Sequence, residues 1–180
     1  MINGKRVLAI TLARKGSKGI PRKNVSNLCG KPLFLWTVDE VAKSNYIDEH
    51  IISTDDERII DICYLSTNTP KTKAFIRSAK NASDTASSAA AILEVLDQTA
   101  CTHEYVVELM CTNPLKTHTD IDACIKKLDD TDADSVVSVT RVLDQHPSRV
   151  KFIENDILTD FWPEKKESRR QDLTPLAFVR

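Results

Sequence analysis

Short apolar runs alternate with longer amphipathic stretches along the first 140 residues, and this alternation limits the possible folds. Residues 6–12 (RVLAITL) form a continuous apolar run, which is typical of a parallel strand buried on both faces. The longer stretches repeat apolar residues at helical spacing. Strands that alternate with helices form βαβ units, so the sequence predicts an α/β fold with three layers and a mostly parallel sheet.

The individual elements follow from these periods. Strands are predicted at residues 6–12, 50–54, 105–110 and 135–140. Helices are predicted at residues 32–44, 55–65, 84–98 and 117–128, and residues 66–83 are expected to be irregular. Pro32 is expected at the first position of its helix, with Leu33, Trp36, Thr37 and Val41 on the inner face. Asp84 is expected as an N-cap, a ligand contact or both, and the apolar side of its helix is Ala89, Ile92, Leu93 and Leu96.

The pattern changes at residue 145. Residues 150–153, 157–162 and 176–179 are alternating or aromatic segments, with prolines between them. Such segments are typical of β-structure that is too small to bury its own core. The sequence therefore predicts a core domain over residues 1–144 and a small β-rich appendage over residues 145–180.

Composition excludes several classes of protein. The chain has 180 residues, of which 41% are hydrophobic and 28% charged, as in an ordinary globular domain. Its longest nearly apolar run, residues 7–13, is far shorter than the ~20 residues that span a bilayer, so we expect no membrane partner and no secretory leader. The five cysteines are odd in number and form no C-x-x-C pair. We therefore expect free thiols and a cytoplasmic protein.

Charge and glycine are concentrated at the start of the sequence. Residues 1–38 contain eight lysines and arginines and no acidic residue, whereas the remaining residues carry a net charge of −9. All four glycines lie within the first 30 residues. A basic loop with glycines after a strand suits a compact anion. Nucleic acid is not predicted as a partner, because the acidic remainder would repel its backbone and the loop lacks stacking aromatic residues.

The loop after the first strand carries the most specific pattern. Residues 12–24 read LARKGSKGIPRKN, which fits neither the P-loop nor the G-x-G-x-x-G pattern. The stretch resembles the signature A-R-x-x-S-K-G-[IL]-x-x-K-N of the nonulosonate cytidylyltransferases, the CMP-N-acetylneuraminate synthetase family, and keeps every fixed position. That resemblance implies a Rossmann-like nucleotidyltransferase fold.

Further segments resemble motifs of the same family in the same order. Residues 75–88 (FIRSAKNASDTASS) are similar to R-P-x-E-L-A-x-D-x-A-S-S, and residues 109–116 (LMCTNPLK) to L-Q-P-T-S-P-L-R. Residues 133–140 (ADSVVSVT) and 169–173 (RRQDL) also match. In the first of these segments Ser78, Lys80 and Asn81 replace the family's Pro, Glu and Leu. In the second, Met110 replaces a Gln that faces the sugar, Cys111 replaces a Pro, and Lys116 replaces an Arg and so keeps the charge without the planar fork.

The resemblance implies an activity and its residues. The family joins CTP to an acidic nine-carbon sugar such as N-acetylneuraminate, legionaminate or pseudaminate, with Mg²⁺ as cofactor and pyrophosphate as second product. By resemblance Arg14 and Lys23 are catalytic contacts to the triphosphate. The implied nucleotide-binding residues are Leu12, Ala13, Arg14, Gly16, Ser17, Lys23, Asn24, Arg77, Ser87 and Ser88. The implied sugar-binding residues are Met110, Thr112 and Arg170, and the appendage is expected to form a homodimer that carries Arg170 to the partner's site.

Alternatives remain at this point. In the family the aspartates that bind Mg²⁺ follow an N-G-x-x-Y segment, which would lie beyond Arg180, so the sequence identifies no metal ligand. A fragment or a natural short form is then expected to bind CTP but to turn over slowly. A CTP-binding protein without catalysis is one alternative reading. A Kdo cytidylyltransferase is another, although A-S-D-T-A-S-S and R-R-Q-D-L favour the sialate branch.

Overall fold

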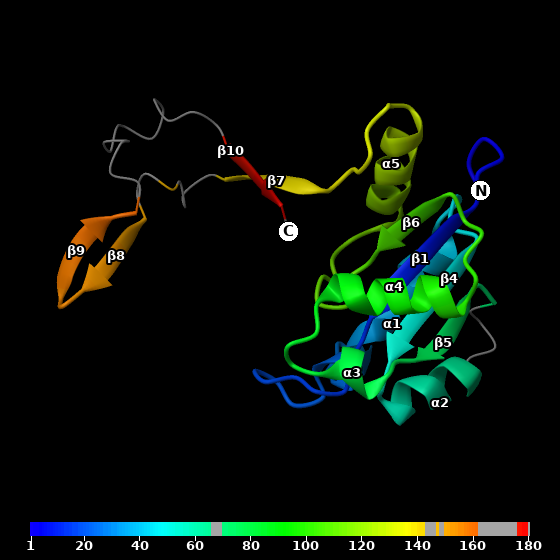
Figure 1. The fold of residues 1–180 in the computed structure, drawn as a ribbon, viewed down its shortest axis with the longest axis horizontal. Coiled ribbons are helices and arrows are strands. Elements are labelled where there is room, and N and C mark those ends of the chain that lie inside the picture. The colour runs from blue at the N-terminus through cyan, green and yellow to red at the C-terminus, as the bar shows by residue number, and fades with distance from the viewer. Residues whose placement is uncertain (66–69, 143–146, 148–149, 162–175, 180) are drawn as a thin grey trace. The chain divides into compact units, whose positions relative to one another are not determined.

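A computed structural model describes residues 1–65, 70–142, 147, 150–161 and 176–179 (Figure 1). The chain divides into two compact units, Met1–Asp134 and Ser135–Arg180. The division into a nucleotide-binding core and an appendage at residue 144 stays a prediction. No helix in the described ranges is long and apolar enough to cross a membrane.

The first unit is built on four parallel strands in the order β5-β4-β1-β6. They are β1 (Val7–Leu12), β4 (Glu49–Thr54), β5 (Thr72–Ile76) and β6 (Tyr105–Glu108). The chain runs outward from β1 through β4 to β5 and then returns to pair β6 with the other side of β1. In such sheets a crevice opens at the carboxyl ends of the two strands where the order reverses. The predicted mostly parallel α/β fold is confirmed.

Helices cover both faces of this sheet, with α4 (Ser88–Gln98) in front of it in Figure 1. Side chains of β1 alternate between the two sides: Val7 and Ala9 pack with α1 (Leu33–Lys43) and α5 (His118–Asp129), whereas Leu8 and Ile10 pack with α4. The helix α2 (Glu57–Leu65) packs with α1 over β4. All four of these β1 residues are at most 1% exposed, so β1 is buried on both faces and the three-layer prediction is confirmed.

The first helix presents a different face from the one predicted. Its buried residues are Phe34, Thr37, Val38 and Val41. Thr37 and Val41 are as expected, but Leu33 and Trp36 are only partly buried. The Trp36 indole N–H donates to the Leu28 carbonyl (3.1 Å) and the Lys31 ammonium lies 3.8 Å from the ring centre. Trp36 therefore covers the hairpin of β2 (Asn27–Leu28) and β3 (Lys31–Pro32) instead of entering the core.

Two local boundaries also differ from expectation. Pro32 lies in extended conformation at the N-cap, one residue before the first helical position. Residues 66–83 are not wholly irregular, because they contain β5 and the short helix α3 (Ala79–Ala82). The β5 sequence TKAFI mixes polar and apolar residues because β5 is the edge strand, where a lysine is tolerated and also protects the edge.

The helix α4 begins later than predicted. Ser87 is its N-cap, with the hydroxyl accepting from the Ala90 N–H (3.1 Å), and Asp84 lies in the preceding loop. Ala91 and Val95 are buried, and Ile92 and Leu96 pack beside them. Ala89 and Leu93 are exposed, because the inward stripe at a period of 3.6 residues is set by the positions of Ala91 and Val95.

The fourth predicted strand does not join the parallel sheet. It forms later, as β7 (Val139–Val142), and pairs antiparallel with β10 (Leu176–Val179) in the second unit. That unit also contains the hairpin of β8 (Lys151–Glu154) and β9 (Ile157–Asp160). Asn155 and Asp156 connect these strands with φ angles of 53° and 61°, as a two-residue hairpin turn with positive φ at both positions requires. The β-rich character of the C-terminal segment is confirmed.

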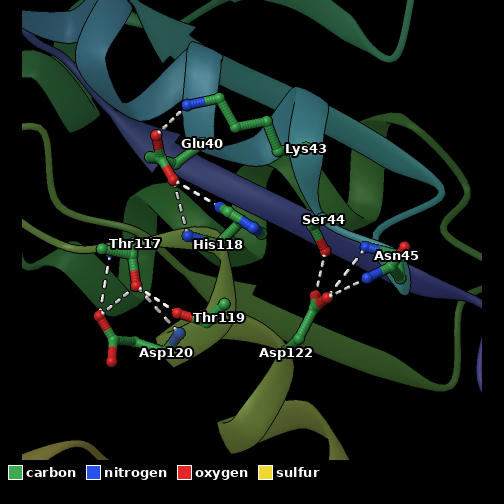
Figure 2. A network of polar contacts seen from close by, with 9 residues as sticks. All are labelled: Glu40, Lys43, Ser44, Asn45, Thr117, His118, Thr119, Asp120 and Asp122. Atoms are coloured by element: carbon green, nitrogen blue, oxygen red, sulfur yellow. Dashed lines mark hydrogen bonds and ion pairs between the residues drawn. The ribbon is translucent and has the colours of Figure 1, made fainter.

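Polar contacts join α1 to the start of α5 (Figure 2). One Glu40 carboxylate oxygen accepts from the His118 backbone N–H (2.8 Å) and from its Nδ1 (2.9 Å), and the other accepts from Lys43 (2.6 Å). One helical turn further, Asp122 accepts from Ser44 and Asn45. Burial alone would raise the pKa of Glu40, but the hydrogen bonds from Lys43 and His118 outweigh it and lower the pKa to about 2.

Replacing Glu40 by Gln should therefore destabilise the protein in a pH-dependent way. The folded pKa lies below the ordinary value of 4.5, so the stabilisation is present above pH 4.5 and is lost as the pH falls towards 2. We expect Glu40→Gln to lower the free energy of unfolding by about 1.5–3 kcal/mol at pH 7, the range for hydrogen bonds to a charged group. The difference from the unaltered chain should shrink in urea titrations between pH 5 and pH 3. Glu57→Gln, at an exposed acid of α2, is the control, and an equal loss in both variants would contradict the prediction.

Candidate functional site

A cavity of about 480 Å³ opens at the carboxyl ends of β1 and β6, where the strand order reverses. Leu12 and Glu108, the last residues of these strands, form its floor. Three segments complete the walls: the loop that follows β1, residues 77–91 up to the first turn of α4, and residues 109–112 after β6. All of them belong to the first unit, so the cavity lies within one compact body.

Most of the residues predicted for the site line this cavity. They are Leu12, Arg14, Gly16, Ser17, Lys23, Asn24, Arg77, Ser87, Ser88, Met110 and Thr112. Ala13 is buried instead; its N–H donates to the Ser53 carbonyl (2.9 Å) and its carbonyl accepts from the Thr54 hydroxyl (2.6 Å). Ala13 thus anchors the start of the loop to β4. Arg170 lies outside the described residues.

Four cations meet around the cavity: Arg14, Lys18 and Lys23 from the loop after β1, and Arg77 from a distant part of the sequence, after β5. Arg77 is only 6% exposed, and its guanidinium donates to the Ser53 hydroxyl (3.0 Å) and carbonyl (2.6 Å). Burial lowers the pKa of Arg77, but an arginine keeps its charge at any physiological pH. It therefore supplies a fixed positive charge at the cavity wall.

The Asp84 carboxylate joins two of these cations. Arg14 Nη1 donates to the carboxylate (2.9 Å) and to the Ser83 carbonyl (3.0 Å), while the Lys18 ammonium lies 3.3 Å from the other carboxylate oxygen. The contacts with Lys18 and Arg14 lower the pKa of Asp84, so it remains ionised. Both Arg14 contacts use Nη1. Among the described residues its Nε and Nη2 have no partner, and they can grip an anion.

The loop that carries Arg14 is held by its own hydrogen bonds. The Asn24 side chain is buried and donates to the Arg14 carbonyl (3.0 Å), and the Lys15 N–H donates to the Asp55 carboxylate (2.6 Å). At Gly16 a side chain would meet no atom within 4 Å, so the space beside this glycine is open to a ligand. Asn24 therefore positions the Arg14 backbone in addition to lining the cavity.

The first turn of α4 completes the site. Ser87 and Ser88 line the cavity and begin an 11-residue helix. The first N–H groups of a helix lack partners within the helix and carry partial positive charge, which favours anions. Combined with the four cations, this arrangement suits a ligand with several negative charges more than an ordinary neutral metabolite.

Sequence reasoning missed several cavity residues. Lys18 had a signal, because it stands inside the S-K-G part of the quoted loop motif, and Glu108 lies near the end of the strand predicted at residues 105–110. Asn81 and Ser83 stand inside the quoted segment 75–88, but at positions that match no fixed residue of the family motif. For metal binding, the described part of the chain contains no group of three or more His, Cys, Asp or Glu side chains that could hold an ion.

Comparison with protein families and known sequences gives consistent matches. The cytidylyltransferase family model matches residues 8–172. Pseudaminic acid cytidylyltransferase from Campylobacter jejuni is 31% identical over 173 residues, covering 93% of this chain and 72% of that protein. N-acylneuraminate cytidylyltransferase from Streptococcus agalactiae is also 31% identical, over 174 residues. That match covers 95% of this chain but only 41% of the streptococcal protein.

Solved structures show the same fold. A structure of CMP:2-keto-3-deoxy-manno-octonic acid synthetase complexed with CTP superposes with a TM-score of 0.60 and 19% identity. The match covers 74% of this chain and 50% of that protein. At this identity the likeness concerns the arrangement of strands and helices.

The Asp84 contacts generate a prediction about anion affinity. Asp84→Asn removes a negative charge but keeps an oxygen that can accept from Arg14, so the positive potential in the cavity rises. We expect inorganic tripolyphosphate to bind about three- to fivefold more tightly, because a unit charge at ~4 Å in a solvated site acts with ~1 kcal/mol. Calorimetric titration at fixed ionic strength measures this. Asp97→Asn, at the far end of α4, makes the same change of net charge and should have no effect. Weaker binding by Asp84→Asn would contradict the prediction.

Proposed function

The chain belongs to the cytidylyltransferase family, and we propose that it activates an acidic nine-carbon sugar with CTP to give the CMP-sugar and pyrophosphate. The observation that carries this proposal is the cavity at the ends of β1 and β6, where Arg14, Lys18, Lys23 and Arg77 surround a space of about 480 Å³. A triphosphate needs several cations in one place; the loop after β1 supplies three of them, and the fold brings Arg77 to the same cavity.

The proposed reaction makes one bond and breaks another. The anomeric hydroxyl oxygen of the sugar attacks the α-phosphorus of CTP and loses its proton to solvent. The bond from the α-phosphorus to the bridging oxygen breaks, and that oxygen leaves with pyrophosphate. Such transfers depend on positioning and on neutralising developing charge. Arg14 and Lys23 are proposed to hold the triphosphate, and this is supported by their position at the cavity that the start of α4 also lines.

The remaining proposed contacts follow the same resemblance. Arg77, Ser87 and Ser88 line the cavity and are proposed to bind the nucleoside. Met110 and Thr112 lie on the segment after β6 and are proposed to contact the sugar, while Arg170 is proposed to meet its carboxylate from a partner subunit. The names of the relatives support N-acylneuraminate or pseudaminic acid as the sugar.

Mg²⁺ is proposed as the cofactor. A bound Mg²⁺ ion would neutralise the charge that develops on the departing pyrophosphate. Asp84 and Glu108 are the carboxylates at the cavity, and Asp84 is engaged by two cations. The described residues thus do not make up a metal site on their own, and the steps above rest on the protein's cations. The five free thiols support the proposal of a reducing, cytoplasmic location.

CTP binding tests the nucleotide assignment. We expect calorimetry with Mg²⁺ to show that CTP binds more tightly than ATP, GTP or UTP. Arg14→Ala and Lys23→Ala should each weaken CTP binding by about 1.5–3 kcal/mol without changing the circular dichroism spectrum. Lys15→Ala is the matched control, because Lys15 belongs to the same loop but does not line the cavity. Equal affinity for ATP would contradict the cytidine assignment.

Pyrophosphate release then distinguishes the alternatives within the family. N-acetylneuraminate, pseudaminic acid and 3-deoxy-manno-octulosonate are offered in turn with CTP. Release with a nine-carbon acid supports the proposal, and release with the eight-carbon acid alone favours a Kdo cytidylyltransferase. CTP binding with no release from any acid identifies a binding protein without catalysis.

Exposed apolar residues of the second unit lead us to propose a homodimer. Ile153 and Leu158 form a cross-strand pair of the β8–β9 hairpin and are 74% and 66% exposed. Light scattering at tens of micromolar should give about twice the chain mass of 20.2 kDa. Lysine at both positions should give the monomer mass. A control variant with Leu65→Lys and Leu93→Lys, at exposed leucines of the first unit, should remain dimeric, and a monomeric unaltered chain would contradict the proposal.

A further inference from the structure

Lys116 makes three hydrogen bonds behind the cavity. It lies in the segment that connects β6 to α5, and its ammonium donates to the Thr37 hydroxyl of α1 (2.7 Å). It also donates to the carbonyls of Met110 (3.0 Å) and Asn113 (2.9 Å). An ammonium has three N–H groups, so every donor is used. Two of these contacts close the segment on itself, and the third ties it to α1.

The segment held in this way supplies one wall of the cavity. Met110, Cys111 and Thr112 line the cavity, and the Met110 side chain is 54% exposed there. The Asn113 N–H donates to the Met110 carbonyl (3.2 Å), which makes residues 110–113 a tight turn. The Lys116 ammonium donates to the carbonyls of Met110 and Asn113, the first and last residues of this turn, so it supports the turn directly.

We propose that Lys116 is a positioning residue for the reaction, whose ammonium fixes the turn 110–113 against α1 and so places Met110 and Thr112 in the cavity. The consequence for catalysis rests on the proposed function, because it requires these two residues to contact the acidic sugar. The mechanical role does not, since it concerns only the turn and the helix. Lys116 itself does not line the cavity and touches no substrate in this proposal.

The far end of the segment has an independent attachment (Figure 2). His118 binds Glu40, which lies one turn after Thr37 on α1, and Thr117 forms a capping box with Asp120 at the start of α5. Loss of the Lys116 contacts therefore releases the turn while α5 stays attached to α1. Substitution of Lys116 should act locally.

The surroundings of Lys116 support a requirement for its charged form. Burial lowers the pKa of Lys116 to about 8, partly offset by Cys111 and Glu40. The titratable groups that interact electrostatically with it are Cys111 on its own segment, Glu40 on α1 and His50 on β4, and Glu40 is in turn bonded to His118 on α5. Burial raises the pKa of Cys111 to about 11 and lowers that of His50 to about 3, and the pKa of Glu40 is about 2.

Among these groups, Cys111, Glu40 and His50 thus keep one state between pH 7 and pH 9.5, while Lys116 loses its proton. The neutral amine has two N–H groups for three acceptors. One contact must then be lost, or the Thr37 hydroxyl must reverse and donate to the amine. In either case the Met110 and Asn113 carbonyls exchange a charge-assisted hydrogen bond for a weaker neutral one or for none, so the turn is held less firmly.

Met110 provides a direct probe, because the only other methionine in the sequence is Met1. Protein labelled with ¹³C at the methionine methyl groups gives one signal from each. We expect Lys116→Leu and Thr37→Val to shift and broaden the Met110 signal, and Lys127→Leu, at a surface lysine of α5, to leave it unchanged. In the unaltered chain the signal should titrate with a midpoint near pH 8. This midpoint should disappear in Lys116→Arg and persist in His118→Gln.

Kinetics provides the second readout. Lys116→Leu should raise KM for the acidic sugar at least tenfold and change KM for CTP less than twofold, and Lys116→Arg should recover part of the loss. An unchanged Met110 signal in folded Lys116→Leu and Thr37→Val overturns the proposal, as does an equal rise of both KM values. If the unaltered protein releases no pyrophosphate, the proposed function fails, and the methionine signals alone decide whether Lys116 positions the turn.

Discussion

The site depends on the burial of β1 between two parallel neighbours. β1 pairs with β4 on one side and with β6 on the other, and its side chains enter apolar clusters on both faces. A strand held in this way has a fixed end, so the loop that leaves it begins at a defined point. The hydrogen bonds of Ala13 to Ser53 and Thr54 also fix the first residue after β1. The cations that follow are therefore carried by a rigid base, which a binding site requires.

The charges around the cavity come from segments that the sheet order brings together. Arg14 follows β1, Arg77 follows β5, and Asp84 precedes α4. Asp84 occupies one edge of the Arg14 guanidinium and leaves the other edge to a ligand. Arg77, in contrast, donates to both the hydroxyl and the backbone carbonyl of Ser53 on β4, and these two bonds fix its guanidinium. The site thus combines a buried fixed charge with an exposed arginine whose orientation is set by a carboxylate.

Polar contacts along α1 position the segment after β6, which lines another part of the cavity. The Thr37 hydroxyl accepts from Lys116, and one turn later the Glu40 carboxylate accepts from His118. Just after α1, the Asn45 N–H donates to Asp122. Successive turns of α1 thus bind successive parts of the chain after β6. These contacts lie beside the apolar cluster of α1, α5 and β1. The apolar cluster stabilises the packing of the two helices, whereas the directional polar bonds define where the turn 110–113 and the start of α5 lie.

The sequence by itself determined the α/β class, the buried first strand and the basic loop after it, because burial and helical or strand periods are local properties of a chain. The loop motif also identified Leu12, Arg14, Gly16, Ser17, Lys23 and Asn24, which line the cavity, but it included the buried Ala13 and missed Lys18. It did not determine that 72–76 form the fourth parallel strand while 139–142 pair with 176–179, since an edge strand has a mixed pattern and its partner lies far away in sequence. Nor did it reveal that Ser87 rather than Asp84 caps α4, or that Phe34 rather than Trp36 enters the core. Those outcomes were decided by tertiary structure. Asp84 accepts from Arg14, 70 residues away in the sequence, and Trp36 donates to Leu28 in the neighbouring hairpin. Such competing contacts exist only once the fold has brought the segments together.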